Sequence, residues 1–212
     1  MVNFKDCTLA DLEKNFGLVQ VDRFPALEDW LNGSADISNF ERESLITFQE
    51  RLHLSGYDWN ETELAYGFIG PIMALVNYAT PHTCNFFAGR AFGGTVDGIE
   101  MSGKPDGMIA SGFRVPEKPF FCFQEYKKQK DPEGDPAGQA LAAMLVAQEI
   151  NEQRHPIYGA YIQGRDWCFI ALKGKKYAIS EPLVATRNDI FDIYRILKVL
   201  KQIILKLIME RQ

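Results

Sequence analysis

Between residues 120 and 162, an apolar strand, a helix and a second apolar strand follow one another, and this succession strongly limits the possible folds. Residues 120–127 are mostly apolar and turn polar at their end, which is typical of a strand buried in a sheet. Asp135 and Pro136 suit the N-cap and first position of a helix over 137–151. Residues 157–162 then predict the next strand. A helix crossing between two strands predicts a mixed sheet with helices on its faces.

The segments around this unit extend the same prediction. Residues 85–127, rich in aromatic residues, glycine and β-branched residues, predict a β-meander of about three strands. Two further strands and a long helix are predicted over 167–172, 177–180 and 188–210, and residues 1–55 are predicted to be helical and acidic. We therefore expect an α/β fold with a central mixed sheet, an N-terminal helical extension and a C-terminal helix.

A helix that begins after Asn60 carries carboxylates in its first turn. Asn60 suits the N-cap, and Glu61 and Glu63 follow it, where acidic side chains complement the positive end of the helix dipole. Apolar residues at helical spacing continue to residue 76 and indicate one buried face. Pro71 lies inside this pattern and predicts a kink or a junction of two helices.

Composition and charge exclude several function classes. No apolar run approaches the length of about 18 residues needed to span a bilayer, and the N-terminus lacks the features of a signal peptide, so we expect a cytoplasmic location and no membrane association. The sequence contains no CxxC pair, GxSxG or P-loop motif. The net charge of −5 combines 6 basic and 14 acidic residues over 1–99 (−8) with 17 and 14 over 100–212 (+3). A nucleic-acid partner is therefore compatible with the second half of the chain.

Three charged residues are predicted to meet at one strand end. Glu125 and Lys127 alternate on the strand over 120–127, and a hairpin turning at residues 116–119 would bring Asp106 beside Glu125. Two carboxylates, together with the backbone carbonyl of Tyr126, are the hard oxygen ligands that Mg²⁺ prefers. An adjacent lysine can orient a nucleophile or neutralise a phosphate transition state. The pattern favours metal-assisted phosphodiester hydrolysis with Mg²⁺ or Mn²⁺.

These residues form a motif that resembles a known family. Pro105-Asp106 followed by Glu125-Tyr126-Lys127 resembles the PD-(D/E)xK motif of the restriction-endonuclease-like nucleases, whose core is a helix, a three-stranded meander, a crossover helix and a further strand. The spacing of Glu61, some ten residues before Pro71, resembles the first core helix of the family branch found in the R subunits of type I restriction enzymes. The resemblance covers about residues 57–182, which implies a helical extension over 1–56 and a separate C-terminal helix over 183–212.

The resemblance implies a DNA nuclease, with a possible role in restriction or phage defence. It assigns Asp106, Glu125 and Glu61 to the metal, Lys127 to catalysis, and Gln139 to positioning the lysine or a DNA phosphate. Glu63 is the alternative to Glu61, and Gln139 has the alternative of an ordinary surface residue. Independently of the family, Lys128 and Lys130, which follow the motif, and Arg165 in a predicted hairpin turn are candidates for phosphate contacts.

Several alternatives stay open from the sequence. The chain could be an inactive nuclease-fold module that binds nucleic acid or a protein partner, because one fold hosts both active and inactive sites. DNA and RNA are not distinguished, nor are endonuclease and exonuclease. No helicase motor is present, so a helicase or specificity partner would be a separate chain. The final helix is apolar over more than half its circumference, which predicts packing on the sheet or N-terminal helices, or a homodimer contact.

Overall fold

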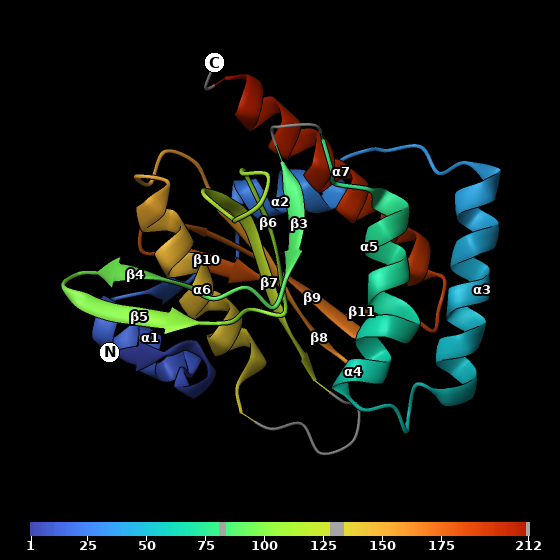
Figure 1. Ribbon diagram of the computed structural model, residues 1–212, viewed down its shortest axis with the longest axis horizontal. Helices are drawn as coiled ribbons and strands as arrows, with labels where there is room; N and C mark the ends of the chain where they lie inside the picture. The colour runs from blue at the N-terminus through green and yellow to red at the C-terminus, as the bar shows by residue number, and fades with distance from the viewer. Residues whose placement is uncertain (81–83, 128–133, 211–212) are drawn as a thin grey trace.

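A mixed β-sheet runs through the centre of the molecule (Figure 1). The computed structural model describes residues 1–80, 84–127 and 134–210, and of residues 122–127 it describes the backbone only. The strand order is β2 (Val19–Gln20), β10 (Lys176–Ile179), β9 (Asp166–Lys173), β8 (Ile157–Gln163), β7 (Pro119–Lys127), β6 (Gly107–Ala110) and β3 (Asn85–Ala88), and β11 (Leu183–Val184) pairs with β9. The predicted α/β class with a mixed sheet flanked by helices is confirmed.

The predicted crossover joins the two central strands. β7 and β8 are parallel, with Phe121 opposite Tyr158, and the helix α6 (Pro136–Ile150) connects them. The backbone N–H of Gly138 donates to Oδ1 of Asp135 at 2.9 Å, so Asp135 caps this helix, with Pro136 at its start. The strands on either side, β6 and β9, are antiparallel to their neighbours β7 and β8.

The meander contains more strands than the sequence predicted. β3, β6 and β7 form a three-stranded antiparallel unit in the main sheet, but a hairpin of β4 (Phe92–Val96) and β5 (Ile99–Gly103) is inserted between β3 and β6. The hairpin turns at Asp97 and Gly98, whose φ angles of 49° and 81° match the tight turn that fits twisted strands. β5 also pairs with β1 (Val2–Asn3), which creates a second, three-stranded sheet.

One face of the main sheet is covered by α6, η1 (Phe4–Asp6) and α1 (Leu9–Phe16). α6 lies between the main sheet and the small sheet, and residues on all its sides are buried, which explains its uniformly apolar sequence. Side chains of the strands alternate between the two faces: Ile157 packs on the α6 side, and Tyr158 belongs to the opposite core.

The opposite face carries most of the helices. They are α2 (Pro25–Asn32), α3 (Asn39–Ser55), α4 (Glu61–Leu64), the π-helical segment η2 (Ala65–Ile69), α5 (Gly70–Val76) and α7 (Asp189–Met209). Trp30 of α2 is fully buried here, its indole N–H donates to the carbonyl oxygen of Ile196 at 2.9 Å, and its ring meets Phe169 edge-on. The segment expected as a separate extension over 1–56 therefore shares the core of the sheet, and it also supplies β1 and β2.

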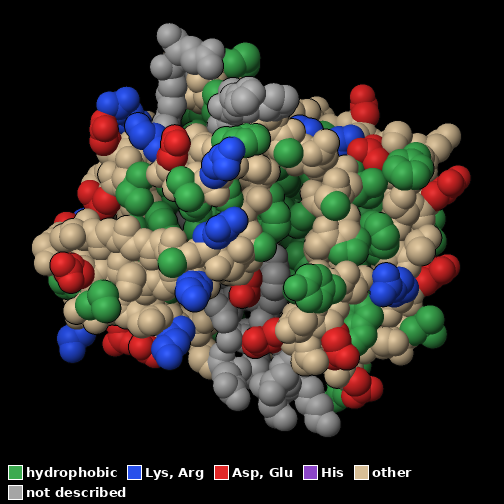
Figure 2. Space-filling view, in the orientation of Figure 1, with side chains coloured by type: hydrophobic (Ala, Val, Ile, Leu, Met, Phe, Trp, Pro, Cys, Tyr) green, Lys and Arg blue, Asp and Glu red, His purple; other side chains and the backbone are tan. Residues whose placement is uncertain are grey.

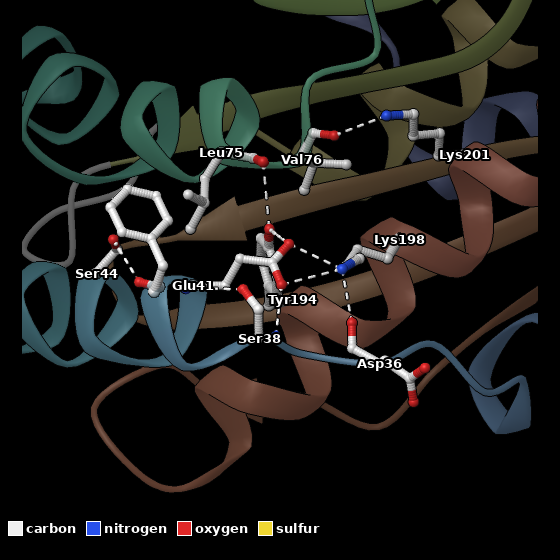
Figure 3. Close-up of polar contacts among 10 residues, drawn as sticks. Asp36, Ser38, Glu41, Ser44, Leu75, Val76, Tyr194, Lys198 and Lys201 are labelled. Carbon is white, nitrogen blue, oxygen red and sulfur yellow. Dashed lines mark hydrogen bonds and ion pairs between the residues drawn. The ribbon is translucent and has the colours of Figure 1, made fainter.

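A partly buried polar cluster connects α3 to α7 (Figure 3). The Glu41 carboxylate accepts hydrogen bonds from the Lys198 ammonium at 2.8 Å and the Tyr194 hydroxyl at 2.7 Å, and it also closes the capping box with Ser38. Beside this cluster, the apolar face of α7 packs against α2, α3 and α5. The last helix therefore packs on the N-terminal helices, one of the arrangements expected from the sequence, and Ile203, Leu207 and Ile208 near its end stay partly exposed.

In the described part of the chain, no helix combines the length and the apolar character needed to cross a bilayer.

Candidate functional site

Asp106 lies at the beginning of β6, at the end of the hairpin where β7 carries the other motif residues. Gly107, the next residue, pairs with Phe123 of β7, so the same antiparallel register would place Asp106 opposite Gln124, one residue before Glu125. The backbone carbonyl of Asp106 accepts from the N–H of Gly89 at 3.0 Å, which ties this point to the strand β3. Lys127 is the last residue of β7 and pairs with Gln163. The side chains of Glu125, Tyr126 and Lys127 lie outside the described part.

Two glutamates in the first turn of α4 are in different environments. Glu63 closes a capping box: its Oε2 accepts from the N–H of Asn60 at 2.8 Å, and Oδ1 of Asn60 accepts from the N–H of Glu63 at 2.9 Å. The N-cap predicted at Asn60 is therefore confirmed. Glu61 is exposed at the first position of the helix and takes no part in this cap. Glu63 thus has a structural role in capping the helix, which Glu61 does not share.

Glu61 and Asp106 line one cleft. Its volume is about 350 Å³, and its walls come from α4, η2, β3 and the start of β6, with Tyr66 and Phe86 among the other lining residues. The face containing it has Asp and Glu side chains near the beginning of α4 (Figure 2). Two carboxylates from segments far apart in sequence therefore converge on a space that a small ligand or ion can enter.

A π-helical segment forms one wall of this cleft. Pro71 has no N–H, and its ring would clash with the carbonyl four residues earlier in a continuous α-helix. The chain accommodates it by the wider turn of η2, in which the N–H of Gly70 donates to the carbonyl of Ala65. The predicted kink or junction at Pro71 is confirmed, and it places Ala65 and Tyr66 along the cleft.

The donor set of the cleft suits a hard cation. Carboxylate oxygens are the ligands that Mg²⁺ and Mn²⁺ prefer. Among the residues whose side chains are described, no three His, Cys, Asp or Glu converge as a metal-binding group. Glu61 and Asp106 supply two carboxylates, and the third in the sequence prediction, Glu125, is among the residues whose side chains are not described.

Gln139 lies in a neighbouring cavity. It is 5% exposed, so the alternative of an ordinary surface residue is wrong, and the chain from Cys7 to Leu9 lies directly against the first turn of α6. It lines a cavity that also contains Lys104 and Pro105, the two residues directly before Asp106. The side-chain oxygen Oε1 of Gln139 is buried, and no described group forms a hydrogen bond to it. Lys104 was missed by the sequence analysis, although its place beside the Pro-Asp pair was visible.

The candidate phosphate contacts are only partly described. Arg165 is exposed in the turn between β8 and β9, at the end of the sheet where β7 also ends. It lines a separate small pocket with His53, Tyr57 and Thr186. Lys128 and Lys130 fall outside the described residues. Because β7 and β8 are parallel and Lys127 pairs with Gln163, the turn at Arg165 and the end of β7 lie at the same end of the sheet.

The described cysteines do not offer an alternative nucleophile. Burial raises the pKa of Cys7 to about 11, with Asp6 and Asp11 adding to the effect, and burial raises the pKa of Cys84 to about 12. Burial also raises the pKa of Cys168. Since the thiolate is the reactive form, these three side chains are unreactive at neutral pH.

No protein-family model matches the chain, and no curated protein sequence matches it significantly.

Proposed function

We propose that this protein is a metal-dependent deoxyribonuclease of the PD-(D/E)xK type, which hydrolyses phosphodiester bonds at the end of β7. The observation that carries the proposal is the convergence of Glu61 and Asp106 on one cleft, next to the strand positions of Glu125 and Lys127. The order of elements supports it too: a helix, the meander of β3, β6 and β7, the crossover helix α6 and the parallel strand β8 follow the order of the resembled core.

Glu61, Asp106 and Glu125, with the backbone carbonyl of Tyr126, would hold one Mg²⁺ or Mn²⁺ ion. When bound, such an ion supplies positive charge next to the phosphate and acidifies a water molecule. The exposed position of Glu61 at the rim of the cleft suits an accessory ligand that also meets solvent. The capping role of Glu63 supports the choice of Glu61 over its neighbour.

Lys127 would carry the role of the catalytic cation. Lys127 follows Glu125 by two residues on β7. The first half of this strand contains the buried core residues Phe120 and Phe121, which fix the position of the strand backbone. A cation held at a strand end can orient the attacking water or stabilise negative charge developing on the phosphate. In this proposal Arg165, Lys128 and Lys130 contact the DNA backbone and contribute sequence-independent affinity.

The competing function is a nuclease-like module that binds nucleic acid or a protein partner without cleavage. No described contact distinguishes the two, so the test has to measure chemistry. The partners proposed from the sequence, a separate helicase or specificity chain, are compatible with either function. A homodimer through α7 has less support, because α2, α3 and α5 cover much of its apolar face.

The test is a cleavage assay with Mg²⁺ or Mn²⁺ on supercoiled plasmid and on single-stranded DNA. We expect Lys127→Ala to lower the rate at least about 100-fold, by analogy with loss of one charge-stabilising group. Lys118→Ala is the matched control, since this exposed lysine precedes the opposite end of β7. Equal rates for Lys127→Ala and the unaltered chain would refute the assignment. Absence of cleavage on both substrates with both metals would favour the binding module.

A further inference from the structure

A second cavity lies beside the cleft, between α6, η1 and the end of β5. Its volume is about 700 Å³, which is twice that of the Glu61–Asp106 cleft and within the range of sites that bind small organic ligands. The two spaces share one segment of chain. Lys104 and Pro105 line the larger cavity, and the next residue, Asp106, lines the cleft. A ligand in the larger cavity would therefore be adjacent to the proposed reaction centre.

The charge of this cavity is opposite to that of the cleft. Lys5 and Lys104 line it, both are exposed, and its lining contains no aspartate or glutamate. In the described part of the chain, neither ammonium group forms an ion pair. Figure 2 shows Lys and Arg side chains, together with some Asp and Glu, over the β4–β5 side of this face, and mainly acidic side chains near the start of α4. The cavity is thus suited to an anion.

Apolar groups and one buried amide complete the lining. The rings of Phe4 and Phe92 lie 6.0 Å apart between their centroids and provide an apolar wall, to which Ala140 and Ala143 of α6 add. Gln139 lines the same space, and its Oε1 is a buried acceptor that no described group satisfies. Such an atom costs stability unless a donor reaches it. A ligand with an N–H or O–H group, an apolar ring and a phosphate would match the buried acceptor, the apolar wall and the two lysines.

We propose that this cavity binds one unpaired nucleotide of the substrate strand, with Lys5 and Lys104 on its phosphate and Gln139 on its base or sugar. The inference rests on the proposed nuclease function and deepens it. A base that is stacked in a duplex has to leave the stack to enter a cavity in the protein. The substrate is therefore single-stranded, or locally unpaired, beside the bond that is cleaved.

Binding without cleavage provides the test. Fluorescence anisotropy of a labelled oligothymidylate is measured over a series of salt concentrations in EDTA, with a blunt, fully paired duplex as the comparison. We expect Lys5→Ala and Lys104→Ala each to weaken oligothymidylate binding about 3- to 10-fold and to reduce the slope of log K against log salt by about 0.7, the value for one phosphate contact on a single strand. Duplex binding should change much less. Lys173→Ala, an exposed lysine at the turn after β9, is the charge-matched control and should match the unaltered chain.

Each result is decisive for the cavity. Equal losses on single strand and duplex would indicate general electrostatic attraction and overturn the proposal, as would variants that bind like Lys173→Ala or an unaltered chain that does not bind oligothymidylate. Competition by thymidine 5′-monophosphate, but not by inorganic phosphate, would support a nucleotide rather than a bare anion, and the reverse would overturn it. If no DNA is cleaved but the lysine variants lose single-strand binding selectively, the nucleotide-binding cavity is supported and the nuclease function is rejected. If DNA is cleaved but both lysine variants bind like the unaltered chain, the nuclease function is supported and the nucleotide-binding cavity is rejected.

Discussion

Glu61 at the start of α4 and Asp106 at the start of β6 line the same cleft, although more than forty residues separate them in the sequence. The relationship depends on two local features. The capping box of Asn60 and Glu63 fixes where α4 begins, and the pairing of Gly107 with Phe123 fixes where β6 begins. Each carboxylate is thus positioned by backbone hydrogen bonds next to it, and the same scaffold holds the strand end that carries Glu125 and Lys127.

The two glutamates of α4 should respond differently to replacement by alanine. Glu61→Ala is expected to lower metal-dependent cleavage by about 10- to 100-fold, because a supporting ligand is lost. Glu63→Ala is expected to cost about 0.5–1 kcal/mol of unfolding free energy through loss of the capping box, with the rate retained. Urea denaturation and initial cleavage rates measure both. Equal effects of the two replacements on the rate would contradict the separate roles.

The two buried glutamines of α6 provide a second matched pair. Gln148 exchanges two hydrogen bonds with the backbone of Gly174, at 2.7 and 3.1 Å, whereas Oε1 of Gln139 has no partner among the residues that the structure describes. Gln148→Met should therefore destabilise the protein by about 1–3 kcal/mol, and Gln139→Met should be neutral or stabilise it by up to about 1 kcal/mol. Calorimetry compares the two. If Gln139→Met also weakens oligothymidylate binding, the polar atom is retained for a ligand at the expense of stability.

The local elements were predictable because each has a short-range signal. The N-caps Asn60 and Asp135 were found from the residue type before an apolar run, and the kink at Pro71 from the missing N–H. The parallel crossover around α6 followed from the order of strand and helix patterns. These signals act over a few residues, so one sequence suffices to detect them.

The less predictable features depend on long-range pairing. Nothing local in Val2–Asn3 or Val19–Gln20 indicates that these short segments add strands to two sheets. The β4–β5 hairpin was merged with the meander, because its pairing with β1 rather than with the main sheet is a tertiary choice. For the same reason Lys5 was not associated with Lys104, and the cavity between them was missed.

The Glu41 cluster predicts how stability depends on pH. Burial by itself raises the pKa of Glu41, but hydrogen bonds from Lys198, Tyr194 and Ser38 outweigh this effect and lower the pKa from 4.5 to about 2. A carboxylate with a depressed pKa in the folded state stabilises the protein above its unfolded pKa, and this contribution is lost as the pH falls towards about 2. Glu41→Gln, which can still close the capping box, should cost about 1–2 kcal/mol at pH 7.

Urea titrations of Glu41→Gln and the unaltered chain between pH 7 and pH 3 measure this contribution. The difference in unfolding free energy is expected to be constant down to about pH 5 and to shrink below it. Glu43→Gln is the control, since Glu43 lies on the exposed side of the same helix. A difference that stays constant to pH 3, or that grows on acidification, would contradict the assigned pKa direction.

Because of the position of Trp30, we expect that the protein does not fold without its first 56 residues. Trp30 is fully buried among Phe121, Tyr158 and Phe169, and its N–H donates to the carbonyl of Ile196, so one side chain connects α2, the sheet and α7. Trp30→Ala should lower the free energy of unfolding by about 3–5 kcal/mol, which is the size known for large-to-small changes in a core.

A chain that starts at residue 57 should fail to unfold cooperatively, because the apolar faces of the sheet and α7 lose their cover. Phe40→Ala, which alters a 71% exposed aromatic residue of α3, should change stability by less than about 0.5 kcal/mol. A shortened chain with a sharp thermal transition would instead support an independent nuclease core over 57–182.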